Sequence, residues 1–108
     1  MEILITREFK KNYKQLSRKY PSLPEDLKEF QPQLLSNPFL GVELAGGFCK
    51  IRLSIKSKGK GKSGGARVIT FNYLVEKTCD RIVLVKMYDK SEVENISDKD
   101  IRQAFETL

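Results

Sequence analysis

The sequence predicts an α+β domain in which a small antiparallel β-sheet carries two N-terminal helices and one C-terminal helix. Three observations support this fold class. Residues 1–37 contain two segments with apolar residues at helical spacing, residues 50–88 contain three strand-like segments with short connections, and a capped amphipathic segment follows. Short links between consecutive strands favour an antiparallel meander with the helices packed on one face. The expected order is β-α-α-β-β-β-α in a single domain over residues 1–108.

The N-terminal segment is predicted to form a short strand and then an amphipathic helix. Residues 2–5 are the candidate strand, and Thr6 is a suitable N-cap for the helix that follows. Apolar residues recur at helical spacing and place one face against the core, leaving lysines on the other. These apolar residues are Phe9, Tyr13, Leu16 and Tyr20.

The second helix is predicted to begin at a capping box formed by Ser22 and Glu25 and to end near Asn37. Pro32 lies inside this segment, and a proline in a helix interior costs about 3 kcal/mol. We therefore expect a kink or a break near residues 29–31. Asn37-Pro38 and the glycines that follow then mark a connecting loop.

Three strands are predicted in the second half of the chain. The first, residues 50–56, alternates without interruption between a core face of Ile51, Leu53 and Ile55 and a polar face of Lys50, Arg52, Ser54 and Lys56. After a glycine–lysine loop, residues 67–75 are rich in β-branched and aromatic residues, which is typical of a central strand. In the third strand, residues 81–88, alternation places Ile82, Leu84, Lys86 and Tyr88 on one face. Ser97 is the predicted N-cap of the last helix.

The composition excludes several classes of protein. Apolar residues make up 40% and charged residues 31% of the chain, and the longest aliphatic run, residues 82–85, is far shorter than the roughly 20 residues of a spanning helix. Charge resumes at Arg7, which leaves no room for the apolar core of a secretory leader, so we expect a cytoplasmic protein without membrane contact. Histidine is absent, which excludes Ser-His-Asp and Cys-His catalysis. Cys49 and Cys79 have no metal-ligand spacing and are expected to be core residues, and no cofactor is expected.

All of the net charge of +6 belongs to one segment. Residues 50–67 contain seven cations and no acid, while the remainder holds 13 cations and 14 acids. Such a concentration indicates a polyanionic partner, with nucleic acid the first choice. A second basic stretch, residues 7–19, is interpreted as the solvated face of a helix.

The glycine–lysine loop does not match a nucleotide-binding P-loop. Lys56 stands where the motif requires its first glycine, and the loop leads into a strand instead of a helix. Its lysines are suited to contact phosphates without reading bases, although a solvated hairpin tip remains the alternative for each of them. The candidate phosphate-binding residues are Lys56, Lys58, Lys60, Lys62 and Lys86.

Cations from separate strands are expected to meet on one exposed face of the sheet, where they would suit RNA cleavage. RNA carries its own nucleophile in the 2′-hydroxyl, so cleavage requires in-line positioning, a base, and cations that stabilise the developing charge. A lysine among like charges, Tyr88 and Glu92 are alternatives for proton transfer. The candidate catalytic residues are Lys50, Arg52, Arg67, Tyr88, Lys90 and Glu92.

Three sequence blocks resemble the RelE/ParE superfamily of bacterial toxins from type II toxin–antitoxin systems, specifically its RelE/HigB-like branch. They are Lys50-Ile51-Arg52, the block from Gly59 to Ile69 that reads GKGKSGGARVI, and Tyr88-Asp89-Lys90-Ser91-Glu92. The resemblance implies a RelE-like fold and a cytoplasmic toxin that inhibits translation by cleaving mRNA on the ribosome. It also implies a cognate antitoxin that neutralises the protein.

The resemblance also implies roles for individual residues. Lys50 and Arg52 match a basic pair on the first hairpin strand, and Arg67 matches an arginine early in the next strand; these residues contact RNA or stabilise the transition state. The family's C-terminal arginine and tyrosine have no such match, because residues 88–94 offer Tyr88, Lys90 and Glu92 in a different pattern. The alternatives are a ParE-like, non-enzymatic inhibitor of DNA gyrase and a non-toxic RNA-binding relative. The basic strand favours the ribonuclease.

Overall fold

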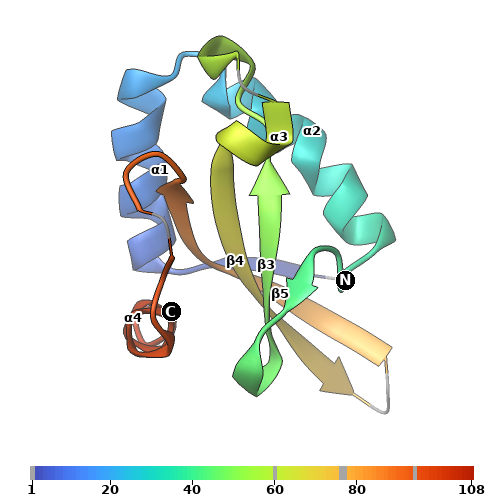
Figure 1. The fold of residues 1–108 in the computed structure, drawn as a ribbon. Helices are drawn as coiled ribbons and strands as arrows, with labels where there is room; N and C mark the ends of the chain where they lie inside the picture. The colour runs from blue at the N-terminus through green and yellow to red at the C-terminus, as the bar shows by residue number, and fades with distance from the viewer. Residues whose placement is uncertain (1, 60, 76–77, 94) are drawn as a thin grey trace.

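The computed structural model describes residues 2–59, 61–75, 78–93 and 95–108, apart from the side chains of residues 62, 63, 75 and 78. Its elements are β1 (Glu2–Ile5), α1 (Arg7–Lys19), α2 (Leu23–Ser36), β2 (Val42–Glu43), β3 (Phe48–Leu53), β4 (Ala66–Val75), β5 (Thr78–Asp89) and α4 (Asp98–Phe105). Short helical turns η1 (Ala45–Gly47), η2 (Lys56–Lys58) and α3 (Gly61–Gly64) lie in the connections. The strands form one sheet in the order β1-β5-β4-β3-β2 (Figure 1), so the predicted α+β class is confirmed.

The sheet is mixed, whereas the sequence predicts an antiparallel one. Consecutive strands from β2 to β5 pair antiparallel, as expected for short connections. β1 instead pairs parallel with β5, with Glu2 opposite Arg81 and Ile5 opposite Leu84. Two helices follow β1, so β1 does not form a hairpin with the next strand. The long connection between β1 and β5 permits parallel pairing. The two-residue strand β2, which the sequence analysis missed, forms the other edge.

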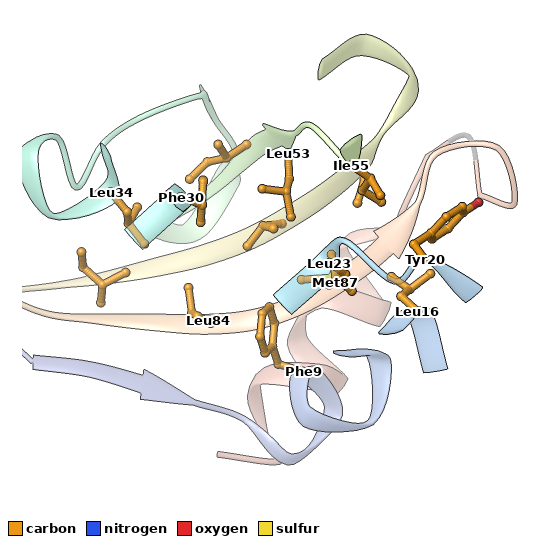
Figure 2. Packing of buried hydrophobic residues seen from close by; sticks show 14 residues of the cluster. Phe9, Leu16, Tyr20, Leu23, Phe30, Leu34, Leu53, Ile55, Leu84 and Met87 are labelled. Carbon is orange, nitrogen blue, oxygen red and sulfur yellow. The ribbon is translucent and has the colours of Figure 1, made fainter. Parts of the chain in front are cut away.

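Helices cover both faces of the sheet instead of the single face expected. α1 and α2 cover one face, where the core shown in Figure 2 includes Phe9, Leu23 and Leu34. α4 packs on the other face through Ile101 and Ala104. The central strands β4 and β5 are apolar on both sides, and a strand of this kind requires cover on both.

A β-bulge changes the facing of residues at the end of β5. Ile69 pairs with Lys86 while Thr70 pairs with Leu84, so β5 contains one extra residue at Val85. Simple alternation predicts Tyr88 on the same face as Leu84. Leu84 instead belongs to the core under α1 and α2, while Tyr88 belongs to the core under α4. The bulge therefore brings Tyr88 to the opposite face of the sheet from the one predicted.

The helix termini follow the predicted caps in part. Thr6 Oγ1 accepts a hydrogen bond from Phe9 N at 2.9 Å and donates one to Val85 O at 2.7 Å, which joins the start of α1 to β5. The predicted capping box at Ser22 is not formed, because its hydroxyl donates to Asp26 Oδ2 at 2.7 Å. α2 also continues without a break through Pro32. In the described ranges, no helix has the length and apolar character needed to cross a membrane.

Candidate functional site

A cavity of about 490 Å³ lies along β2 and β3 and is bordered by the end of α2 and the segment after β5. Its lining includes four cations, Lys50, Arg52, Arg67 and Lys90. The other lining residues are Gln33, Leu40, Gly41, Val42, Ile51 and Asn95. None of the described lining residues is acidic, so the cavity is a concentrated positive site.

Strand register explains why these cations meet. Arg52 of β3 pairs with Arg67 of β4, and Arg67 pairs in turn with Tyr88 of β5. Directly paired residues project from the same face of a sheet, so the three form one row across three strands. Lys50 lies two residues before Arg52 and therefore projects from that face in the adjacent row.

Arg67 is the buried member of the cationic group. Only 6% of its surface is exposed, and Nη1 donates a hydrogen bond to the carbonyl oxygen of Ala66 at 3.1 Å. Burial lowers the pKa of Arg67 and the neighbouring charge of Arg52 lowers it further, while Tyr88 acts in the opposite direction. An arginine nevertheless remains protonated in proteins, so Arg67 is a fixed positive charge at the cavity.

A glycine permits the close approach of β2 to β3 beside the cavity. Gly41 has a φ of +92°, and a Cβ atom at this position would lie 2.3 Å from the carbonyl oxygen of Lys50. Both the positive φ and the close contact exclude ordinary side chains. Gly41 thereby allows the chain that leads into the edge strand β2 to contact the backbone of β3 at Lys50.

Tyr88 lies in the row of Arg52 and Arg67 but is not part of the cavity lining. It is buried, and its hydroxyl has no hydrogen-bond partner among the residues that the structure describes. Burial raises the pKa of Tyr88, an effect that the charge of Arg67 partly offsets. The phenol is therefore neutral near pH 7 and is suited to donate a proton but not to accept one.

The structure separates the two candidates that follow Tyr88. Lys90 lines the cavity, and its backbone N–H donates to the carbonyl oxygen of Gly65 at 3.2 Å. Glu92 forms an ion pair with Lys19 of α1 at 2.8 Å and lines a different hollow, beside α1. Four of the six predicted catalytic residues therefore line one cavity. Tyr88 is buried opposite Arg67 on β5, and Glu92 lines a different hollow beside α1.

The predicted phosphate-binding residues are engaged in ion pairs where the structure describes their side chains. Lys56 pairs with Glu29 at 2.6 Å, and Lys86 pairs with Glu8 at 3.0 Å. Lys58 pairs with the buried Asp89 at 2.5 Å. None of these lysines lines the cavity. Lys60 and the side chain of Lys62 lie outside the described residues.

The comparison with protein families decides the identity of the chain. Residues 1–107 match the model of the family described as the RelE toxin of the RelE/RelB toxin–antitoxin system. The protein belongs to the RelE toxin family. The predicted resemblance is confirmed over nearly the whole chain, and membership makes this RelE-family protein the toxin of a toxin–antitoxin system, with an antitoxin as its implied partner.

Sequence analysis of this RelE-family toxin missed Gln33 and Asn95, which also line the cavity. Gln33 is an exposed residue of α2 and Asn95 lies in the segment before α4, and neither position carries a periodicity or motif that marks it. Among the described residues, no group of three or more His, Cys, Asp or Glu side chains is arranged to hold a metal ion.

Proposed function

We propose that this RelE-family toxin is a ribosome-dependent, metal-independent mRNA endonuclease that inhibits translation. The observation that supports the proposal is the meeting of Lys50, Arg52 and Arg67 with Lys90 in one cavity whose described lining contains no acid. Attack of a 2′-hydroxyl on the adjacent phosphorus adds negative charge to the phosphate oxygens. Preorganised cations in a partly enclosed site stabilise such charge strongly, because they do not have to reorient during the reaction.

The four cations have different proposed roles that follow from their burial. Arg67 is buried and lines the cavity, so we assign the positive charge of its guanidinium to stabilising the charge that develops on the scissile phosphate. Arg52 is exposed in the same row and is positioned for the same phosphate or the next one. Lys50 pairs with Ile69, two residues after Arg67, and Lys90 lies beside Gly65, two residues before it. We therefore assign these two lysines to holding the flanking backbone in a bent, in-line conformation.

Proton transfer is assigned to the residues nearest this row. The neutral Tyr88 is proposed to donate a proton to the leaving 5′-oxygen, which requires the RNA to reach its buried hydroxyl. We propose that one cavity lysine, reacting as its neutral amine, accepts the proton of the 2′-hydroxyl, while Arg52 and Arg67 supply the positive charge at the phosphate. Glu92 is held by Lys19 away from the cavity, and its predicted part in proton transfer stays a prediction.

Dependence on the ribosome is consistent with the size of the site. A cavity of about 490 Å³ has room for a nucleotide and its phosphates but not for folded RNA. The message must therefore be presented as a single strand. We propose that the decoding site of the ribosome presents the message in this way, as the family resemblance implies.

A translation reaction with purified components tests this function. The protein is added to ribosomes stalled on a defined mRNA, and the 5′ ends of the products are mapped by primer extension. We expect a new end on ribosomes and none on the same mRNA alone. A single 2′-deoxynucleotide before the cut should abolish that cut, because it removes the nucleophile.

The alternatives predict different results. Intact transcripts together with DNA breakage in cells that express the protein would support a ParE-like gyrase inhibitor and overturn the proposal. Normal growth on expression would support a non-toxic RNA-binding relative. A matched pair of variants, Arg67→Gln in the cavity and Arg18→Gln on the exposed face of α1, should separate loss of the site from a general loss of positive charge.

A further inference from the structure

The carboxylate of Asp89 is completely buried at the end of β5, between Tyr88 and Lys90 in sequence. It accepts hydrogen bonds from the Tyr20 hydroxyl at 2.5 Å and from Lys58 Nζ at 2.5 Å. The backbone N–H and the hydroxyl of Ser91 also donate to it, at 2.9 Å and 2.7 Å. A buried charge is tolerated only when it is paired and hydrogen-bonded, and these donors meet that requirement.

The donors come from three separate segments of the chain. Tyr20 follows α1, Lys58 lies in η2 between β3 and β4, and Ser91 lies in the turn after β5. Figure 2 shows the Tyr20 ring at one end of the core, with its hydroxyl pointing away from the other apolar side chains. The Asp89 carboxylate therefore fastens two distant segments to the end of β5.

Asp89 also organises the turn that carries Lys90. Its backbone carbonyl accepts hydrogen bonds from the N–H groups of Glu92 and Val93, both at 3.1 Å. Its side chain holds the intervening Ser91 from the other end. Contacts with Asp89 and Gly65 therefore help to fix the position of the Lys90 backbone relative to the cavity.

We propose that Asp89 and Lys58 act as one positioning unit for RNA cleavage, in which the buried ion pair fixes the turn that presents Lys90 to the cavity and the strand end that holds Tyr88 behind Arg67. This inference rests on the proposed endonuclease function. It gives Lys58 a role different from the phosphate contact that the sequence predicts.

Geometry favours the positioning role for Lys58 over a phosphate contact. Only 8% of its side chain is exposed, and Nζ also lies 3.3 Å from Ser91 Oγ. If Lys58 turned towards a phosphate, the buried Asp89 carboxylate would lose its closest cation and be left with the longer ion pair to the half-exposed Lys19, whose Nζ lies 3.8 Å from Oδ2. Weakening the compensation of a buried charge is unfavourable, so RNA binding does not provide a reason for Lys58 to leave.

A double-mutant cycle on ribosome-bound mRNA tests the proposal. Asp89→Asn, Lys58→Met and the double variant are compared with wild type in kcat and KM, with Lys28→Met on the exposed side of α2 as the matched control. We expect kcat to fall about 10- to 100-fold in each single variant and KM to change less than about 3-fold, because misplacement of catalytic groups affects the chemical step. The double variant should be no worse than the poorer single variant, because both changes disable the same unit.

Other outcomes overturn the inference. A raised KM with unchanged kcat in Lys58→Met, together with multiplicative effects in the double variant, would make Lys58 a direct phosphate ligand. Circular dichroism establishes which variants fold. If Asp89→Asn does not fold, Tyr20→Phe is used in its place, because this change removes only one hydrogen bond to the carboxylate. An unchanged kcat in folded Tyr20→Phe and Lys58→Met then overturns the inference.

The same assay distinguishes this failure from failure of the proposed function. A wild-type protein that does not cut ribosome-bound mRNA overturns both. Cutting by wild type with no effect of any variant overturns the positioning role alone.

Discussion

Arg67 and Tyr88 lie opposite each other in the pairing of β4 and β5, and both side chains are at least nine-tenths buried. A positive charge and a neutral phenol thus share one buried cross-strand position beside a cationic cavity. The pair lies behind Arg52, which is exposed.

Replacement of Tyr88 by Phe should lower the cleavage activity without lowering the stability of the fold. The Tyr88 hydroxyl is buried without a hydrogen-bond partner among the described residues, so its removal should leave the free energy of unfolding unchanged or raise it by about 1 kcal/mol. Loss of a proton donor should lower the rate of cleavage by about 100-fold or more. Urea unfolding and the ribosome cleavage assay measure the two effects. Cleavage at the wild-type rate would remove Tyr88 from the catalytic residues.

Replacement of Arg52 by Ala should impair cleavage without affecting the fold. Arg52 lines the cavity but is exposed, so the free energy of unfolding should change by less than about 0.5 kcal/mol. Loss of one cation that stabilises the transition state should lower kcat by about 100-fold. Arg18→Ala, an exposed arginine on α1, is the matched control and should behave as wild type. Equal effects of the two variants would argue against a localised site.

Stability at acidic pH should report on Asp89. Burial alone raises the pKa of this carboxyl, but hydrogen bonds from Lys58, Tyr20 and Ser91 lower it well below its usual range. A lowered pKa stabilises the folded state fully above the pKa of the unfolded chain, about 3.9, and this stabilisation is lost as the pH falls below that value. The difference in free energy of unfolding between wild type and Asp89→Asn should therefore be constant above about pH 5 and shrink below about pH 4.

Denaturant titrations from pH 7 downwards measure this difference. The use of Asp89→Asn as the reference removes the contributions of other carboxylates, including Glu8, whose pKa is lowered by its hydrogen bond with Lys86. A difference that stayed constant down to pH 2.5 would show that the charge of Asp89 does not contribute to folding.

Two glycines with positive φ should respond differently to alanine. At Gly59, with a φ of +72°, a Cβ would meet no atom of the described residues within 4 Å, so Gly59→Ala should cost only the backbone strain of about 1 kcal/mol. At Gly41 the Cβ would also lie 2.3 Å from the carbonyl oxygen of Lys50. Gly41→Ala should therefore cost at least about 2 kcal/mol more and reduce cleavage, because β3 must shift. Similar losses in both variants would contradict the close contact.

Binding of the antitoxin should depend on salt. An acidic segment of the partner is expected to cover the cavity cations, and interactions between partly exposed charges are screened as ionic strength rises. We expect the affinity of the complex to fall between low and high salt and Arg52→Ala to reduce that dependence. Calorimetric titration at three salt concentrations measures both. An affinity independent of salt would indicate an apolar interface elsewhere.

Local patterns in the sequence predicted most of the elements correctly. The periodicity of Phe9 and Leu16, the cap at Thr6 and the alternation of Ile51 and Leu53 are each set by neighbours within a few residues, so they could be read directly. Alternation on β3 also predicted that Lys50 and Arg52 share one face, and that face borders the cavity.

Features that depend on contacts between distant residues could not be predicted in this way. The bulge at Val85 changes the facing of Tyr88, and no local residue marks it. The pairing of Lys58 with Asp89 is likewise a tertiary contact between residues far apart in sequence, as is the pairing of Glu92 with Lys19. Counting charges could locate the basic segment but could not show which of its cations are already bound to carboxylates.

The parallel pairing of β1 with β5 affects the order in which a newly synthesised chain can fold. Thr6 at the end of β1 hydrogen-bonds to Val85, a separation of 79 residues, so β1 cannot pair with β5 until the residues up to Val85 have been synthesised. Contacts between such distant residues slow folding. The row of Arg52, Arg67 and Tyr88 is likewise complete only after β5 has been synthesised, because Tyr88 lies in that strand.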